Sequence, residues 1–302
     1  MPARLILNAD DFGLTRGINR AIDELHSAGV LPSATLMASG AAFDDAVEVA
    51  SAHPALGVGC HIVLTDGAPV SPPDSIPSLI GADGINFRPS LVDFVQALLL
   101  GRINEDEVAR EALAQVEKLQ RAGIHPTHID THKHTHLFPS IARPLLQMAV
   151  RCGIRAIRNP FEPEWSLALE HGSRARRLAI RLIGLLRPRF EAHEQIRDGR
   201  VLTTDGTVAI SATGQLTAST LGEILRALPH TGTYEICCHP GYNDGELDRV
   251  TTRLRAHRDV EREALLAEVP KVLSHSSALV FVHYGDLAVE QNSAAPAIDV
   301  TF

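Results

Sequence analysis

Several features that would assign this chain to a familiar class are missing from its sequence. It has no run of about 18 apolar residues, so no transmembrane segment is expected. The apolar run at residues 5–9 is short, is interrupted by Asn8 and is followed by two aspartates, so a signal peptide is not expected either. Positive charge is outnumbered, with 28 Lys and Arg against 36 Asp and Glu, and a formal net charge of −8 argues against a general nucleic-acid binder.

Cysteines are also few, and their spacing fits no metal or disulfide framework. The four cysteines, Cys60, Cys152, Cys237 and Cys238, form no Cys-x-x-Cys pair and no zinc-finger pattern. Reduced thiols are the simplest interpretation, and we expect a cytoplasmic protein. No glycine-rich loop follows the first predicted strand, so the sequence offers no nucleotide-binding motif.

Histidine, by contrast, is abundant and concentrated. The chain has 15 histidines, and five of them lie between His125 and His136. Histidine is the commonest side chain for metal ligation and for proton transfer near neutral pH. Such a local excess predicts a functional site.

Short apolar runs alternate along the chain with stretches of helical periodicity. Thr15 is predicted to cap a helix, and Asn104 with Glu107 resembles a capping box. Alternating strands and helices indicate βα units and a parallel sheet. We predict an α/β fold, a distorted TIM-like βα barrel with about seven parallel strands, and keep a doubly wound open sheet as the alternative. The predicted strands are 4–9, 33–38, 57–64, 127–131, 155–158, 234–238 and 278–283.

Polar residues of chemical interest follow these strands. Asp10 and Asp11 come directly after the first strand, and His61 lies toward the end of the third. His132 and His239 follow two later strands. In a βα barrel the carboxyl ends of the strands meet on one face, where active sites assemble. We therefore expect these side chains to converge.

The strongest local motif is Asp130-x-His132-x-His134-x-His136. In an extended segment alternate residues face the same side, so these four side chains would share a face. If the chain instead turns after the strand, the later histidines are expected to fan out around the same pocket. A solvated histidine-rich loop is the alternative, and it is disfavoured because the run directly follows a strand. His61 alone would more often be a core residue, and it gains weight only from the barrel geometry.

One aspartate and two histidines can form an open metal site that leaves positions for water and substrate. This ligand set suits Zn²⁺ best, with Mg²⁺, Mn²⁺ or Co²⁺ as alternatives. A bound metal lowers the pKa of its water to about 7 and polarises a carbonyl oxygen. A remaining aspartate can act as base and another histidine as acid. These groups predict hydrolysis of an amide or an ester.

Residues 173–190 carry six arginines interleaved with leucine and isoleucine. Such a helix could lie on a membrane surface. More often it packs its apolar side on the domain and leaves the arginines solvated or paired. We favour the second interpretation over peripheral membrane contact.

The motifs together resemble the YdjC-like carbohydrate deacetylases, a family that includes chitooligosaccharide deacetylase and the hopanoid-biosynthesis-associated HpnK-type proteins. The resemblance implies a distorted βα barrel that removes the N-acetyl group from an amino sugar, within an oligosaccharide or a glycolipid, and releases acetate. Its implied partner is the acetylated amino sugar, and a homodimer is compatible with the family. The segments that carry it are residues 8–14 (NADDFGL), 59–61 (GCH), 127–136 (THIDTHKHTH) and 238–240 (CHP).

The resemblance also implies roles for individual residues. Asp11, His61 and His132 would bind one divalent metal ion. Asp10 would be the general base, and His239 would be the acid that stabilises the departing amine.

Further residues would line the substrate site. The resemblance places His134 and His136 there, and Arg158 would orient the base or contact substrate. The family often has a histidine where this chain has Lys133, which leans toward the HpnK-type branch. We expect one domain over 1–302, with an insertion-like segment at about 161–230 in which no motif matches.

Two other classes of function compete with a sugar N-deacetylase. Another metal-dependent hydrolase on a βα barrel, a phosphoesterase or an amidohydrolase, also suits a histidine cluster. It is mildly disfavoured because no further carboxylates match a two-metal site. A non-catalytic metal- or carbohydrate-binding protein is disfavoured because Asp10 and His239 remain available as base and acid beyond the three ligands.

Overall fold

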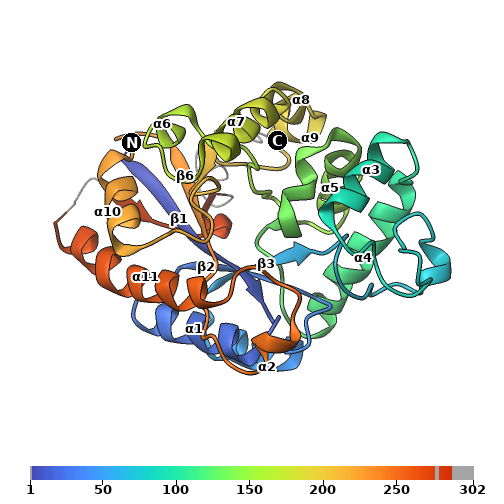
Figure 1. Cartoon of the computed structure of the whole chain (residues 1–302), viewed down its shortest axis with the longest axis horizontal. Coiled ribbons are helices and arrows are strands. Elements are labelled where there is room, and N and C mark those ends of the chain that lie inside the picture. The colour runs from blue at the N-terminus through green and yellow to red at the C-terminus, as the bar shows by residue number, and fades with distance from the viewer. Residues whose placement is uncertain (1, 276–278, 288–302) are drawn as a thin grey trace, which may run out of the picture.

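The computed structural model in Figure 1 describes residues 2–275 and 279–287. Its described strands form one parallel sheet in the order β4-β3-β2-β1-β6-β5, with β7 pairing β1 off that path. The sheet curls into a half-barrel, which confirms the predicted distorted βα barrel. The strands are β1 (Ala3–Phe12), β2 (Ser33–Leu36), β3 (Gly57–Ile62), β4 (Ile129–Thr131), β5 (Gly206–Val208), β6 (Thr233–Cys238) and β7 (Leu279–Phe281).

Helices surround the sheet. In Figure 1, α10, α11 and α1 lie to one side of β1, whereas α3, α4 and α5 lie beyond β3. The described helices are α1 (Arg16–Ser27), α2 (Phe43–Ala52), α3 (Leu91–Leu99), α4 (Glu105–Arg121), α5 (Pro139–Arg151), α6 (Glu164–Leu167), α7 (Arg174–Gly184), α8 (Arg187–Glu191), α9 (Glu194–Arg197), α10 (Ala218–Ala227) and α11 (Ala256–His275), with 3₁₀ turns η1 (Pro73–Ser75), η2 (His132–Leu137) and η3 (Leu247–Arg249).

The helix starts follow the predicted caps in part. The Thr15 side chain accepts the backbone N–H of Ile18 and so caps α1. Asn104 likewise accepts the N–H of Asp106 at the start of α4. Glu107, however, accepts the N–H of Ser78 instead of reaching back to Asn104, so the predicted capping box lacks its reciprocal half.

The sheet differs from the prediction in two places. Residues 155–158 form no strand, but isolated parallel bridges, Ile129 to Ile157 and Ala156 to Leu202, continue the curvature beyond β4. The segment at 161–230, which carries no matched motif, supplies β5 beside β6. A strand of only three residues is too short to produce a hydrophobic period that sequence analysis could detect.

The segment at 173–190 packs as predicted only in part: Phe190 lies in the core, and Ile183 and Leu186 pack against it. Arg177 is buried on the inner side of α7, where it donates to the carbonyls of Glu170 and Gly172. The expectation that the apolar side packs on the domain is therefore wrong for the leucines that this arrangement turns outward. These are Leu178, Leu182 and Leu185, which are 59%, 60% and 74% exposed.

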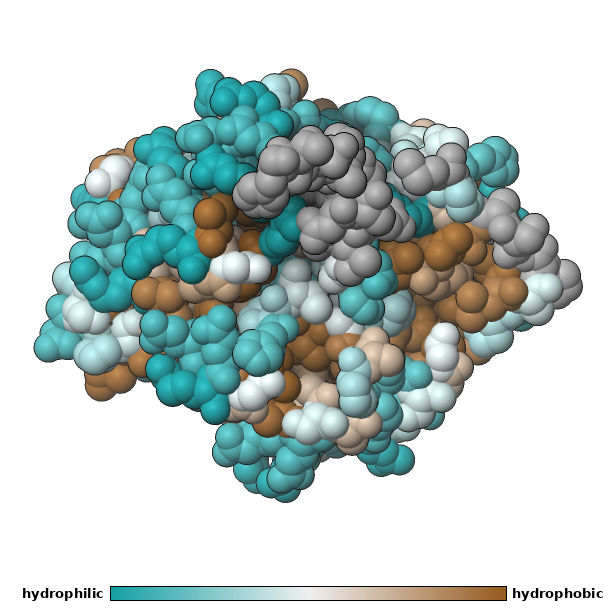
Figure 2. Space-filling model, turned by 180° about the vertical axis from the view of Figure 1, so that it is seen from behind, coloured by the Kyte–Doolittle hydropathy of each residue, from teal (hydrophilic) through white to brown (hydrophobic). Residues whose placement is uncertain are grey.

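The surface elsewhere is mixed. Seen from behind, hydrophobic residues gather in several places and are separated by hydrophilic ones (Figure 2). Among the described residues, no helix combines the length and the apolar composition that crossing a membrane requires.

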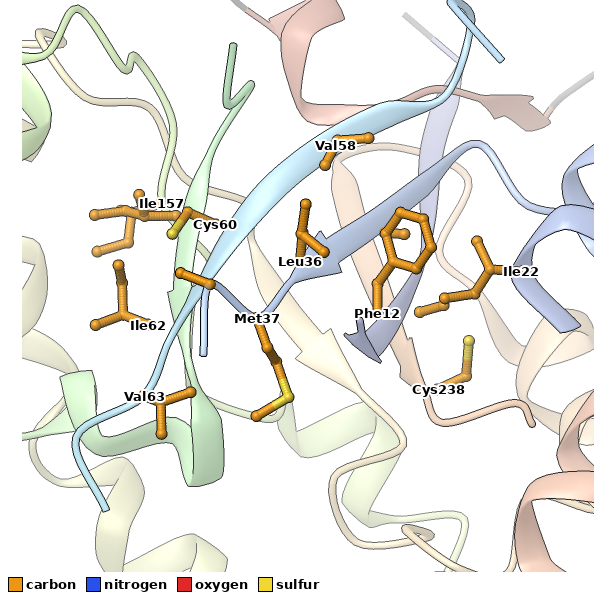
Figure 3. Close-up of a cluster of buried hydrophobic side chains, with 14 of the residues drawn as sticks. Phe12, Ile22, Leu36, Met37, Val58, Cys60, Ile62, Val63, Ile157 and Cys238 are labelled. Carbon is orange, nitrogen blue, oxygen red and sulfur yellow. The ribbon is translucent and has the colours of Figure 1, made fainter. Parts of the chain in front are cut away.

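The core lies between the sheet and the surrounding helices. β1 is almost completely buried, because β2 and β6 pair with its two edges and the core packs against its side chains. Figure 3 shows side chains from β1, β2 and β3 packing together, among them Phe12, Leu36 and Cys60. This rigid centre fixes the carboxyl ends of the strands, from which the candidate site is built.

Gly59 offers a test of how tightly β3 is packed. A Cβ at this position would lie 2.4 Å from Cε1 of His128. His128 is buried and stacks on Tyr284 with ring centroids 3.9 Å apart, so the ring has little room to move. We expect Gly59→Ala to lower the free energy of unfolding, measured by urea denaturation, by about 1–3 kcal/mol.

The matched control is Gly184→Ala at the end of α7, where an added Cβ meets nothing within 4 Å. Alanine is favoured over glycine in a helix by about 0.5–1 kcal/mol, so this variant should be neutral or slightly stabilised. Equal losses in both variants would contradict the packing argument.

Candidate metal and catalytic site

The end of β1 has an unusual backbone that separates its two aspartates. Asp11 has φ 65°, a left-handed conformation that few residues other than glycine adopt. The β1–β2 register also shifts between Ala9 and Phe12, as in a β-bulge. As a result, Asp10 contacts Arg158 whereas Asp11 contacts Arg258. Strained backbone of this kind is often found at functional sites.

Asp11, His61 and His132 converge on one point. Asp11 Oδ1 lies 3.7 Å from His61 Nε2 and 3.4 Å from His132 Nδ1. The two ring nitrogens lie 3.4 Å apart. Residues from β1, β3 and the turn after β4 thus form one small triangle of ligand atoms, as the sequence led us to expect for barrel strand ends.

This triangle fits a divalent metal ion. Bonds of about 2.0–2.2 Å in a tetrahedral site place ligand atoms roughly 3.3–3.6 Å apart, close to the distances found here. Asp11 Oδ1 is buried and has no hydrogen-bond donor, which leaves it available to a cation. His61 Nδ1 lies 2.8 Å from Asp130 Oδ1, an outer carboxylate that orients the ring and leaves Nε2 for the ion.

The electrostatics also favour positive charge at this point. Burial opposes the charged form of Asp11, but Arg258 and His132 hold its pKa well below the usual range. Burial likewise disfavours a charged His61, yet Asp130 and the two site aspartates raise its pKa to about 9. A cation between these groups would replace the proton that the ring otherwise carries at neutral pH.

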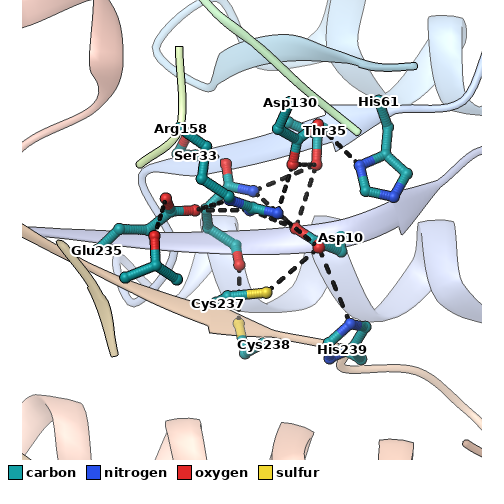
Figure 4. Close-up of polar contacts among 12 residues, drawn as sticks. Asp10, Ser33, Thr35, His61, Asp130, Arg158, Glu235, Cys237, Cys238 and His239 are labelled. Carbon is teal, nitrogen blue, oxygen red and sulfur yellow. Dashed lines mark hydrogen bonds and ion pairs between the residues drawn. The ribbon is translucent and has the colours of Figure 1, made fainter. Parts of the chain in front are cut away.

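Arg158 holds three carboxylates from one buried position (Figure 4). Its Nη1 and Nη2 donate to the two oxygens of Asp10 at 2.8 and 2.6 Å. Its Nε and Nη2 donate to Glu235 Oε1 at 2.9 and 2.6 Å, and Nη1 lies 2.5 Å from Asp130 Oδ2. Burial alone would raise the pKa of Asp10, but this guanidinium keeps that pKa well below the usual range. The structure thus pairs Arg158 with Asp10, one of the two roles considered for it.

His239 lies beside Asp10 at the end of β6. Its Nε2 is 3.9 Å from Asp10 Oδ2, and its side chain is 13% exposed. Its backbone N–H donates to Glu261 Oε2 at 2.6 Å, and its Nδ1 lies 3.9 Å from the same oxygen. The carboxylate of Glu261 therefore fixes the loop that carries His239.

Helix α11 supplies two site residues that sequence analysis did not identify. Arg258 Nη2 donates to Asp11 Oδ2 at 2.6 Å, and Glu261, three residues later, holds His239. Both are buried. Their signal in the sequence is that they share the inward stripe of the helix with the buried Leu265 and Val269. Buried charges on an apolar stripe require partners.

The histidine-rich segment turns directly after β4, which is the second of the two arrangements considered from the sequence. The chain leaves the extended conformation after Thr131 and enters η2, with φ 59° at Lys133 and 53° at His134. Asp130 and the later histidines therefore do not share one face, because side chains alternate regularly only while the chain stays extended.

The two later histidines have different surroundings. His136 is buried, with Nδ1 2.7 Å from Thr131 Oγ1 and Nε2 3.1 Å from the carbonyl of Arg158. Burial and Arg158 lower its pKa to about 3, so the ring is neutral and both nitrogens are occupied. His134 Nδ1 is buried without a hydrogen-bond partner. Of the two, His134 has a ring nitrogen without a partner, whereas His136 has none.

Comparisons with known proteins identify the family of this chain. The profile of the family described as YdjC-like protein matches residues 4–273. A carbohydrate deacetylase of Brevibacillus brevis is 32% identical over 284 residues, covering 94% of this chain and 99% of that protein. A chitooligosaccharide deacetylase of Yersinia enterocolitica is 32% identical over 252 residues, covering 81% and 84%.

A solved structure gives the same result for the fold. It is described as a candidate cellobiose-phosphate cleavage protein of Enterococcus faecalis, and it is 26% identical with a TM-score of 0.75. The alignment covers 95% of this chain and 99% of that one. With the family profile spanning most of its length, the chain belongs to the YdjC-like family.

Proposed function

We propose that this chain is a metal-dependent hydrolase that removes the N-acetyl group from an acetylated amino sugar and releases acetate. The observation that carries the proposal is the convergence of Asp11, His61 and His132 beside Asp10 and His239. The relatives named carbohydrate deacetylase and chitooligosaccharide deacetylase support the choice of reaction.

Asp11, His61 and His132 would hold the metal ion, for which Zn²⁺ is the best match to one oxygen and two nitrogen ligands. When bound, such an ion lowers the pKa of water to about 7 and polarises a carbonyl oxygen. The chain's own residues move the protons. Asp10, ionised at neutral pH, accepts the proton of the attacking water. His239 donates a proton to the amine as the C–N bond breaks.

Two residues keep these groups in place. Arg158 binds both oxygens of Asp10 and so fixes the direction of its carboxylate. Glu261 holds the backbone of His239. Preorganised groups of this kind lower the barrier because they need not rearrange during the reaction.

Acetate release tests the reaction directly. Purified chain loaded with Zn²⁺ should release acetate from N-acetylated amino-sugar oligomers, with one free amine formed for each acetate. Release of phosphate from a generic phosphoester without acetate would instead favour a phosphoesterase. Metal binding with neither activity would favour a non-catalytic binding protein.

Substitutions at the proposed metal ligands test the ligand set separately. We expect Asp11→Ala and His132→Ala to lose metal and activity together, measured by elemental analysis and acetate release. Asp130→Asn leaves the three ligands in place but weakens the outer partner of His61, and it should lower metal affinity by about 10- to 100-fold. Because Asp130 also pairs with Arg158, urea denaturation must show that this variant stays folded. Full metal occupancy in His132→Ala would show that the ligand set is wrong.

A further inference from the structure

A second group of ligand atoms lies on the other side of Asp10. Cys237 Sγ donates to Asp10 Oδ2 at 3.2 Å, and His239 Nε2 lies 3.9 Å from the same oxygen. Figure 4 shows both side chains directed at this carboxylate from β6 and the loop that follows it. No residue of this group belongs to the triangle formed by Asp11, His61 and His132.

The strand geometry explains why only one of two adjacent cysteines reaches Asp10. β6 pairs with β1 so that Cys237 lies opposite Asn8, and successive side chains point to opposite faces. Cys237 therefore faces the site, whereas Cys238 Sγ lies 3.3 Å from the backbone carbonyl of Asn8 and packs in the core. The two residues form a natural test and control.

The donor set is one that soft cations prefer. One carboxylate oxygen, one sulfur and one imidazole nitrogen lie within 4.8 Å of one another. Thiolate and imidazole ligands select Zn²⁺ and softer ions over Mg²⁺. Asp10 and Cys237 are buried, and His239 keeps the group open on one side.

We propose that Asp10, Cys237 and His239 form a second, inhibitory site for a thiophilic divalent cation such as Cd²⁺ or excess Zn²⁺. On binding, the S–H bond of Cys237 breaks, a sulfur–metal bond forms and the proton passes to solvent. The ion then covers the carboxylate and the imidazole that transfer protons in the proposed deacetylation. The inhibitory effect rests on the proposed function, whereas the binding does not.

The second site fills after the first. Arg158 donates to the same Asp10 oxygen, so a cation there is repelled by the guanidinium. Asp10 and Asp11 are adjacent, so an ion in the first site adds further repulsion. At the first site no guanidinium repels the cation from Asp11 Oδ1 in this way, because Arg258 donates to the other oxygen. Inhibition is therefore expected only with metal in excess.

Cadmium titration of the whole protein tests the binding. Chain loaded with one equivalent of Zn²⁺ should take up one further equivalent of Cd²⁺, with the thiolate-to-cadmium charge-transfer absorption in the ultraviolet. Cys237→Ser should lose that absorption and bind the second equivalent more than about tenfold more weakly. Cys238→Ser should behave as the wild type. Cys152→Ser shows how much absorption comes from the one cysteine that is not buried.

His239→Gln provides a second variant that keeps the thiol. It should weaken the binding of the second equivalent of Cd²⁺ and leave the first equivalent of Zn²⁺ bound. This variant keeps the test valid if Cys237→Ser folds poorly. Unchanged binding of the second equivalent in both variants would overturn the proposal.

Activity measurements separate the two proposals. If acetate is released, excess Cd²⁺ should inhibit the wild type, and Cys237→Ser should need more than about tenfold more Cd²⁺ for the same fractional loss of its own rate. Equal sensitivity of the two proteins would overturn the inhibitory role. If no acetate is released but Cys237→Ser still fails to bind the second equivalent of Cd²⁺, the second metal site is supported and the proposed function is contradicted.

Discussion

Replacing Arg158 with methionine is expected to lower the free energy of unfolding by about 3–5 kcal/mol. The side chain is fully buried and is the shared partner of Asp10, Asp130 and Glu235. Methionine fills similar space but leaves these carboxyl groups without their cation. Because uncompensated buried charge costs far more than lost packing, urea denaturation should show a large loss.

The loss of stability in Arg158→Met is expected to depend on pH. Arg158 holds the pKa of Asp10 well below the range near 4 of an unfolded chain, so Asp10 stabilises the wild type above that range and loses this effect as pH falls. In Arg158→Met, burial acts without the arginine and the pKa of Asp10 should rise. The stability gap between the two proteins should therefore be largest at neutral pH and narrow toward pH 4.

Two further variants control the experiment. Arg16→Met removes an exposed guanidinium whose Nε lies 4.0 Å from Glu246 Oε1, and it should change stability by less than about 0.5 kcal/mol. Adding Glu235→Gln to Arg158→Met removes one of the carboxylates left without a cation. This second substitution should recover part of the lost free energy of unfolding. A stability change of Arg158→Met no larger than that of Arg16→Met would refute the buried-charge argument.

The sequence predicted the parts of the site that depend on strand ends. Asp10, His61 and His239 each follow or end a run of apolar residues that becomes a parallel strand, and topology alone brings such ends to one face. The roles assigned to them came from the resemblance to a family.

The remaining parts of the site depend on contacts between distant segments. Arg258 reaches Asp11 from 247 positions away, and no local pattern specifies that pairing. Cys237 is one of two adjacent cysteines, and only the register of β6 against β1 decides which one faces Asp10. The sequence could not decide between an extended segment and a turn after Thr131, because two non-glycine residues adopt positive φ there, which local propensity disfavours.

Asp10→Asn is expected to lower kcat for acetate release by about 10²- to 10⁴-fold while the metal content stays at the wild-type level. The amide has the shape of the carboxylate but cannot accept the proton of the attacking water. Asp11, His61 and His132 are unchanged, so the metal should remain. Elemental analysis and acetate release on the same preparation measure both quantities.

Stability must be followed in the same variant, because both oxygens of Asp10 accept N–H groups of Arg158. The new amide turns one N–H toward the guanidinium, and an unsatisfied buried donor costs about 1–3 kcal/mol. Arg158 retains Asp130 and Glu235, so the variant should stay folded.

Asp83→Asn, on an exposed loop, is the matched control and should keep full activity. A folded Asp10→Asn that holds its metal and keeps more than about a tenth of the wild-type kcat would remove Asp10 from the role of base. A folded variant that loses its metal would instead make Asp10 part of the ligand set.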